Sequence, residues 1–135
     1  MARKRVIDIT ASSTLSKNQS GALVTLSAAG GLTVTLPSPG RGLEYEFVVK
    51  TALTGQNPYN IEVPSVAVAS MKGGVVSGAA DGNPKHQVSS GASKLELNSV
   101  KGGYVGTHIK VVCNNDGKWE VTGVAVGTGT TTIFA

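Results

Sequence analysis

The sequence predicts an all-β protein, and three observations favour this class. Valine (18 residues) outnumbers leucine (9), and β-branched residues pack well on pleated sheets. No long stretch has the i, i+3, i+4 apolar spacing of a helix. Eighteen glycines divide the chain into short segments. We therefore expect an antiparallel β-sandwich or jelly-roll-like barrel of roughly eight to eleven short strands, with no substantial helix.

The two clearest strands lie within residues 31–50. Residues 32–36 and 43–49 both alternate apolar and polar side chains, which is typical of half-buried strands. The prolines and glycines between them predict a surface loop, because proline lacks a main-chain donor and glycine accepts turn dihedrals. The apolar side chains of these strands should form the centre of the core.

Other strands are predicted from weaker alternation on both sides of this stretch. The segment from 51 to 93 is broken by glycine and proline, and residues 79–87 look like a long exposed loop without an apolar anchor. No repeat of fixed period is visible. The remaining expected strands are Val6–Thr10, Ala22–Ser27, Tyr59–Val63, Val66–Met71, Lys94–Asn98, Val105–Cys113, Lys118–Val126 and an edge strand within Thr130–Ala135.

The pair of strands near the C-terminus has a clear turn between them. Asn114–Gly117 predicts a hairpin, since Asn, Asp and Gly tolerate positive φ. In the first strand the odd-numbered residues from Val105 to Cys113 should face inward. In the second strand we expect a bulge at Gly123 that shifts the inward positions to Val124 and Val126.

The inward positions also assign roles to three conspicuous side chains. Trp119 and Phe47 fall on the inner faces of predicted strands, so we expect them in the core and not at a ligand site. Cys113, the single cysteine, has no partner for an intramolecular disulfide and is expected to be a small core residue.

Length and charge indicate one domain with a basic start. Residues 1–5 read as a flexible, positively charged arm, and residues 6–135 as a single β-sandwich domain. The arm holds three of the twelve cations, which leaves nine against eight acidic residues in the body. The charged start is followed by no apolar signal region, and no run is long enough for a membrane helix, so we expect no membrane partner.

No set of residues has the spacing of an active site, so the chain is not expected to be an enzyme. His86 and His108 are predicted on the surface, and neither is spaced from a nucleophile or a carboxylate in a recognisable motif. We expect no metal and no cofactor. Nucleic-acid binding is also not expected, because the cations outside the arm are scattered among acids and few aromatic residues are free to stack.

Two segments resemble small structural proteins of tailed bacteriophages. The first contains Ser20-Gly21, a "TLP" strand at 35–37 and a "YxFVV" strand at 45–49. The second has Asp116-Gly117 followed by a strand with Trp119, Val121 and Gly123. The matches bracket about 100 residues, from 20 to 123, and their order and spacing are more specific than any one of them.

This resemblance implies a capsid decoration, or cement, protein with no catalytic residues. Such a protein would be made in the host cytoplasm, bind the major capsid protein on the surface of the phage head, and stabilise the shell by bridging its subunits. The resemblance also implies a homo-oligomer, with a trimer favoured. It assigns no individual binding residues.

The residues themselves suggest where docking would occur. Charge is concentrated in Arg3, Lys4 and Arg5, and the strand that follows begins with Val6 and Ile7. We expect these five residues to dock on an acidic capsid surface, with charge steering the encounter and strand pairing retaining the complex.

Two alternatives stay open. A tail or fibre adhesion module that binds host glycans would need exposed aromatic residues, and only Tyr59 and Tyr104 look available. A host-secreted or enzymatic β-sandwich is disfavoured by the missing signal region and by the absence of a catalytic cluster.

Overall fold

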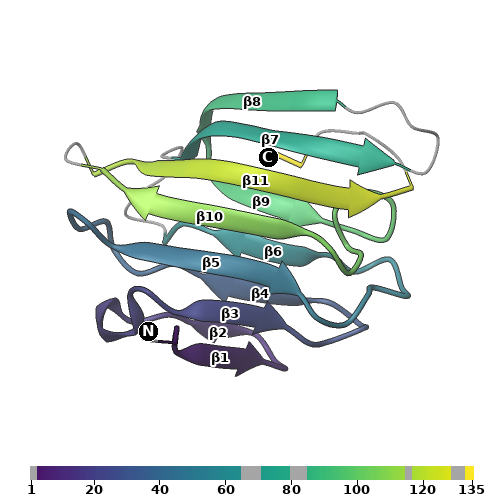
Figure 1. Cartoon of the computed structure of the whole chain (residues 1–135), viewed down its shortest axis with the longest axis horizontal. Helices are drawn as coiled ribbons and strands as arrows, with labels where there is room; N and C mark the ends of the chain where they lie inside the picture. The colour runs from purple at the N-terminus through teal and green to yellow at the C-terminus, as the bar shows by residue number, and fades with distance from the viewer. Residues whose placement is uncertain (1–2, 65–70, 80–84, 115–116, 129–132) are drawn as a thin grey trace.

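A computed structural model defines two β-sheets that pack face to face (Figure 1). It describes residues 3–64, 71–79, 85–114, 117–128 and 133–135. The expected all-β sandwich is confirmed, and within those ranges the helical element is a three-residue 3-10 helix, η1 (Lys17–Gln19). Most of the expected strand Val66–Met71 lies outside the described residues.

Within the described ranges, sheet A has seven strands and sheet B has four. Sheet A contains, in spatial order, β1 (Val6–Ile9), β3 (Leu23–Leu26), β5 (Glu44–Val49), β10 (His108–Cys113), β11 (Trp119–Gly127), β7 (Met71–Ala79) and β8 (Lys85–Ala92). Sheet B contains β2 (Ser13–Thr14), β4 (Leu32–Thr35), β6 (Tyr59–Glu62) and β9 (Lys94–Leu97).

In the first half of the chain, consecutive strands alternate between the two sheets. As a result β1, β3 and β5 pair in parallel, and so do β2, β4 and β6, whereas the sequence led us to expect antiparallel pairing. Each crossing to the other sheet supplies the long connection that parallel strands require. We call each passage of the chain from sheet A through sheet B and back to sheet A a coil. Val6 lies opposite Leu23 and Leu23 opposite Glu46, so the first coil takes 17 residues and the second takes 23. Unequal coils explain why no fixed period was visible.

The second half is built from hairpins. β7 pairs antiparallel with β8, and β10 pairs antiparallel with β11. β11 and β7 then pair in parallel and join the hairpins into sheet A, while β10 pairs antiparallel with β5 and connects them to the coils. Both sheets are therefore mixed, since β9 also runs antiparallel to β6.

The middle of the chain is more regular than its glycines suggested. β7 runs through Gly73, whose missing side chain lets it approach β11: a Cβ there would lie 2.1 Å from the Val121 carbonyl oxygen. The expected loop 79–87 is wrong at both ends, because Ala79 is the last residue of β7, residues from Lys85 onward belong to β8, and Gln87 is buried. Residues 80–84 lie outside the described residues.

Two expectations about the last hairpin are also corrected. Val105 is 62% exposed and precedes β10, because Gly106 has a φ of 107° that interrupts the strand. The bulge at Gly123 does not exist: the pairing of β10 with β11 runs through it without a shift, with Gly123 opposite Ile109. Ala125 therefore stays inward, and Val124 faces solvent.

The core between the sheets contains the side chains that alternation placed there. Trp119 and Phe47 are fully buried, which confirms their prediction as core residues, and the ring of Trp119 lies 6.1 Å from that of Tyr45. Cys113 is also buried, as expected, and desolvation raises the pKa of its thiol. At the C-terminus Phe134 forms an antiparallel bridge to Leu95, so the end of the chain covers the outer edge of β9.

Candidate docking surface

The five residues predicted to dock lie at one edge of sheet A, where β1 is the last strand. Arg3, Lys4, Arg5 and Val6 are exposed, and 59% of the Val6 surface is open to solvent. Ile7 points the other way and packs against the core. The edge therefore presents three cations and one apolar side chain, while Ile7 holds β1 in place.

The basic arm is connected to the sheet before β1 begins. The Leu23 main-chain N–H donates a hydrogen bond to the Arg5 carbonyl oxygen at 2.8 Å. The Lys4 ammonium forms an ion pair with Glu46 of β5, and an Arg5 guanidinium N–H reaches the Asn18 carbonyl oxygen at 3.4 Å. Among the described residues, Lys4 is thus the cation of the arm that forms an ion pair.

Glu46 connects this arm to the middle of sheet A. Its carboxylate also lies 3.0 Å from Nε2 of His108 on β10. The Lys4 ammonium and then the His108 ring hold the pKa of Glu46 below its ordinary value. Sequence reasoning expected no carboxylate beside a histidine, and it missed this pair because the two residues are 62 positions apart and only the β5–β10 pairing brings them together.

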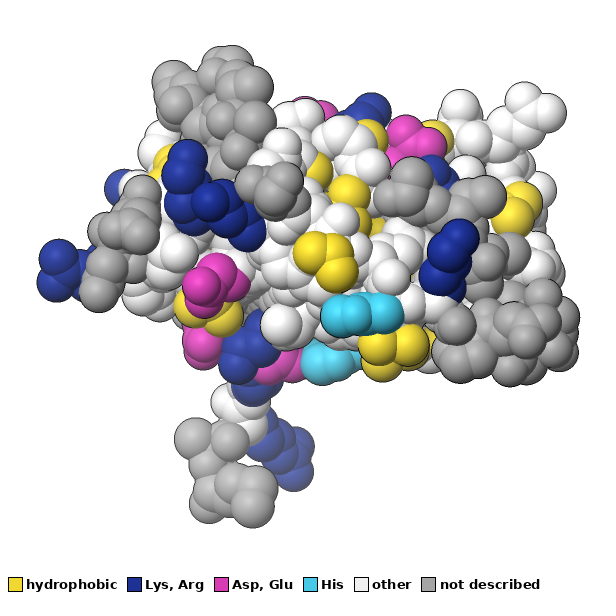
Figure 2. Space-filling model, turned by 90° about the horizontal axis from the view of Figure 1, so that it is seen from above, with side chains coloured by type: hydrophobic (Ala, Val, Ile, Leu, Met, Phe, Trp, Pro, Cys, Tyr) yellow, Lys and Arg dark blue, Asp and Glu magenta, His cyan; other side chains and the backbone are white. Residues whose placement is uncertain are grey.

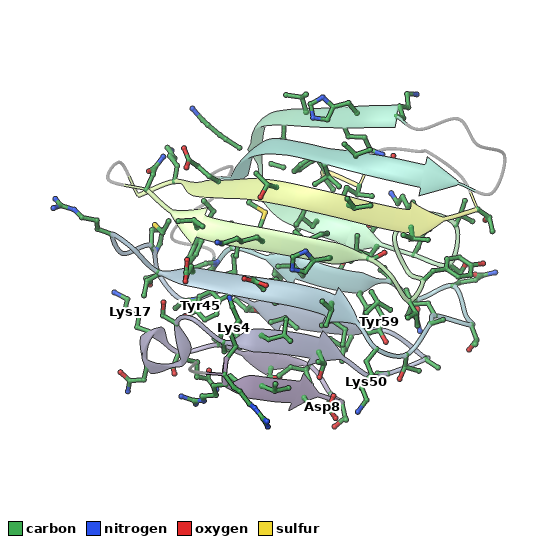
Figure 3. The ribbon with its side chains drawn as sticks, viewed as in Figure 1. Lys4, Asp8, Lys17, Tyr45, Lys50 and Tyr59 are labelled. Atoms are coloured by element: carbon green, nitrogen blue, oxygen red, sulfur yellow. The ribbon has the colours of Figure 1, made fainter. Side chains whose placement is uncertain are left out.

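Asp8 anchors the other end of β1. The hydroxyls of Ser27 and Thr25 donate hydrogen bonds to Oδ1 of Asp8, and the Lys50 ammonium lies 3.9 Å from its Oδ2. The hydroxyl hydrogen bonds, with a smaller effect from Lys50, lower the pKa of Asp8. Figure 3 shows Asp8 and Lys50 side by side at the end of the strands.

The outer face of sheet A changes character from one end to the other. Over β1, β5 and β10 it carries paired charges, including Lys110 and Glu44 at 3.8 Å. Over β11, β7 and β8 it carries exposed valines: Val124, Val76 and Val88 are 46%, 41% and 72% exposed. Figure 2, a view from the β8 side, shows hydrophobic side chains beside the histidines and few charged side chains across the middle.

The aromatic residues considered for glycan binding are less available than expected. Tyr59 is fully buried, and its hydroxyl donates to the carbonyl oxygens of Leu26 and Thr51 and accepts from the Ala28 N–H. The Tyr59 side chain therefore stabilises the fold, and the expectation that Tyr59 is exposed is wrong. Tyr104 is partly buried.

Two other kinds of site are absent from the described ranges. No group of three or more His, Cys, Asp or Glu residues there is placed to hold a metal ion. No helix in those ranges is long and apolar enough to cross a membrane. In comparisons with family models, curated proteins and solved structures, nothing matched the chain.

Proposed function

We propose that the chain is a capsid decoration protein of a tailed bacteriophage, which binds the major capsid protein on the assembled head. The observation that carries the proposal is the edge of sheet A at β1. There an edge strand, paired with β3 on its inner side and carrying an exposed Val6, follows directly on three exposed cations. A strand edge offers main-chain hydrogen bonds to a partner, and the cations favour an acidic one.

Charge and strand pairing would contribute differently to binding. Exposed ion pairs contribute only about 0–1 kcal/mol each, so Arg3 and Arg5 would steer the encounter more than retain it. Retention would depend on main-chain pairing along Val6–Ile9 and on several copies acting together. Lys4 is already paired with Glu46, so its contribution to a partner would require that pair to separate.

A protein of this kind would stabilise the head by mass action. If its contacts exist only in the expanded shell, binding favours that state by an amount that grows with the ratio of free protein to dissociation constant. The resemblance to phage decoration proteins implies that trimers at three-fold positions make these contacts. The protein would then be found on the virion head, after synthesis in the host cytoplasm.

Binding to empty expanded heads of the encoding phage tests this proposal. Deletion of residues 2–5 should slow binding and flatten its salt dependence, while deletion through Thr10 should greatly reduce retention. The double substitution Arg3→Glu/Arg5→Glu should slow binding, and Arg41→Glu/Lys72→Glu is its control, because it changes net charge equally at two exposed positions elsewhere.

Unchanged binding by the longer deletion, measured by cosedimentation with the heads, would remove the β1 edge from the docking site without contradicting head binding. Two results would contradict the proposal itself. One is a full-length protein that does not cosediment with the heads. The other is electron microscopy of labelled virions in which the protein lies on the tail or fibres and not on the head.

A further inference from the structure

Each sheet has two edges, and the four edges differ in how well they are protected. The outer edge of β9 is covered by the end of the chain, where the Ala135 N–H donates to the Lys94 carbonyl oxygen at 3.0 Å. β2 has only two residues. β1 has four, one of them Asp8, and follows the basic arm. β8 has eight residues, and no described strand lies beyond it (Figure 1).

β8 has few of the usual features that prevent edge-to-edge association. Natural edge strands are kept apart by shortness, charge, proline, a bulge or a covering segment. Of these β8 has a bulge near its end, one extra residue between Ser89 and Ala92 where its pairing with β7 shifts register. β8 contains one Lys, at position 85, no Asp or Glu and no proline. Its Val88 side chain is 72% exposed, more than any other exposed large apolar residue among those described.

Hydrogen bonds hold β8 against β7, so the outer edge of β8 has a fixed geometry. Gln87 Nε2 donates to the Ser77 hydroxyl at 2.7 Å, and Gln87 Oε1 accepts from the Ile133 N–H at 2.7 Å. The Ser89 hydroxyl donates to the Met71 carbonyl oxygen at 3.1 Å. These contacts fix β8 against β7 and against the C-terminal segment.

We propose that two copies of the chain associate through β8, antiparallel and about a two-fold axis perpendicular to sheet A. Residues that meet across such an axis must lie on the same face of the pleat. Val88 on the axis satisfies this condition: it meets Val88 of the second copy, and Gln87 meets Ser89 on either side of it, before the register shift that follows Ser89. No like charges then face each other, so the strand is self-complementary in charge.

The neighbouring face of sheet A supports the same contact. Val124 pairs with Val76 across β11 and β7, and Val76 pairs with His86 on β8. This partly apolar row reaches the β8 edge and would continue into the second copy. A strand of eight residues spans about 27 Å, so the contact is narrow and should be reversible and dependent on concentration.

This inference is independent of capsid binding, and it differs from the trimer that the resemblance implies. An isologous contact between identical edges gives a dimer of about 27 kDa, twice 13.7 kDa, whereas a trimer would be about 41 kDa, three times 13.7 kDa. Light scattering coupled to gel filtration, over a range of loading concentrations, distinguishes these masses in the purified protein.

Introducing a charge at Val88 tests the two-fold arrangement of the β8 strands. Val88→Lys and Val88→Glu each place two like charges directly opposite, so each should weaken the dimer about tenfold or more. Mixing the two variants should restore a dimer that contains one copy of each. Val105→Lys is the control, because Val105 is 62% exposed but lies outside the strands. Circular dichroism establishes that each variant is folded.

Three results would overturn the proposal. A wild-type protein that stays monomeric at the highest soluble concentration has no such contact, and a trimeric mass excludes the two-fold arrangement. A dimer that survives Val88→Lys but is lost in Val124→Lys uses the outer face of sheet A and not the β8 edge. None of these results depends on whether the protein binds capsids, so either proposal can be contradicted without the other.

Discussion

The coils of residues 6–62 and the hairpins of residues 71–127 hold their strands together in different ways. In the coils, buried tyrosine hydroxyls fix the connections between sheets: that of Tyr45 donates to the Ser16 carbonyl oxygen at 2.7 Å, and that of Tyr59 contacts three main-chain groups. In the hairpins, glycines allow close approach of main chains. A Cβ at Gly123 would lie 2.2 Å from the His108 carbonyl oxygen.

This difference predicts opposite sensitivities in the two regions. Coils cross between sheets through irregular segments, whose main-chain groups need side-chain partners when they are buried. Hairpins pair their main chains directly and are limited by the space between neighbouring strands. The coils should therefore be sensitive to loss of a hydroxyl, and the hairpins to gain of a methyl group.

The largest effect is expected from Trp119→Ala, which would weaken both regions. Trp119 belongs to β11, but its ring packs beside Tyr45 of the coils. Truncation of a buried aromatic side chain costs about 3–5 kcal/mol, so the free energy of unfolding in urea should fall by that amount. An equally stable variant would contradict the assignment of Trp119 to the shared core.

Gly123→Ala tests the hairpin region alone. The added methyl group would overlap the β10 main chain, and a φ of 150° is rarely adopted by residues with a side chain. Strain of this kind costs about 1–3 kcal/mol, in addition to the overlap. Gly78→Ala is the control in the same region, because a Cβ there meets nothing within 4 Å. Equal melting temperatures for the two variants would remove the close approach as an explanation.

Tyr59→Phe tests the coil region by removal of one oxygen atom. The Ala28 N–H and the carbonyl oxygens of Leu26 and Thr51 would lose a partner. We expect a loss of about 1–2 kcal/mol in the free energy of unfolding, since each hydrogen bond contributes about 0.5–1.5 kcal/mol net. Tyr104→Phe, at a partly buried position, is the control and should change stability little.

The smallest effect concerns pH and the edge at β1. The pKa values of Asp8 and Glu46 are lowered in the folded protein, so these groups contribute stability above their ordinary values of 3.8 and 4.5. That contribution is lost as the pH falls through the lower folded values. Glu46 contacts Lys4 and His108 on this face, and Lys110 lies opposite it on β10.

Thermal melts between pH 7 and pH 3 would measure this contribution. Glu46→Gln should reduce the dependence of the melting temperature on pH in the acidic range, whereas Glu120→Gln, at an exposed position on β11, should not. A wild-type melting temperature that is constant below pH 4.5 would show that the pairs at β1 contribute nothing.

Sequence predicted the strands better than it predicted their partners. Alternation identified β5 with Phe47 inward because burial on one face is a local signal. It could not show that β5 lies beside β3 in parallel, since that depends on where the chain crosses between sheets. Gly73 predicts a break in the strand, because a glycine looks the same in sequence whether it ends a strand or makes room for a neighbour.

The docking residues show the same limit. The basic residues were visible as a cluster, but the attachment of Lys4 to Glu46 depends on two strands, β3 and β5, whose order no local pattern encodes. Exposure of Val88 could not be anticipated either, because glycine and proline break the segment 51–93 and the expected loop 79–87 includes the first three residues of β8. Both features follow from long-range pairing, which alternation does not report.

The alternation of the first six strands between two sheets also constrains how the chain can reach its native state. β1 acquires its neighbour in sheet A only after the chain has passed through sheet B and returned, 17 residues later, and the next neighbour arrives after another 23. Neither sheet can grow by local hairpins in this half of the molecule. The hairpins of residues 71–127 can close early. Each coil must first lose the chain entropy of closing a long loop before its strands can pair. Refolding should therefore be slow for a chain of this size. We expect the coils to assemble last, when β5 pairs with the edge of β10.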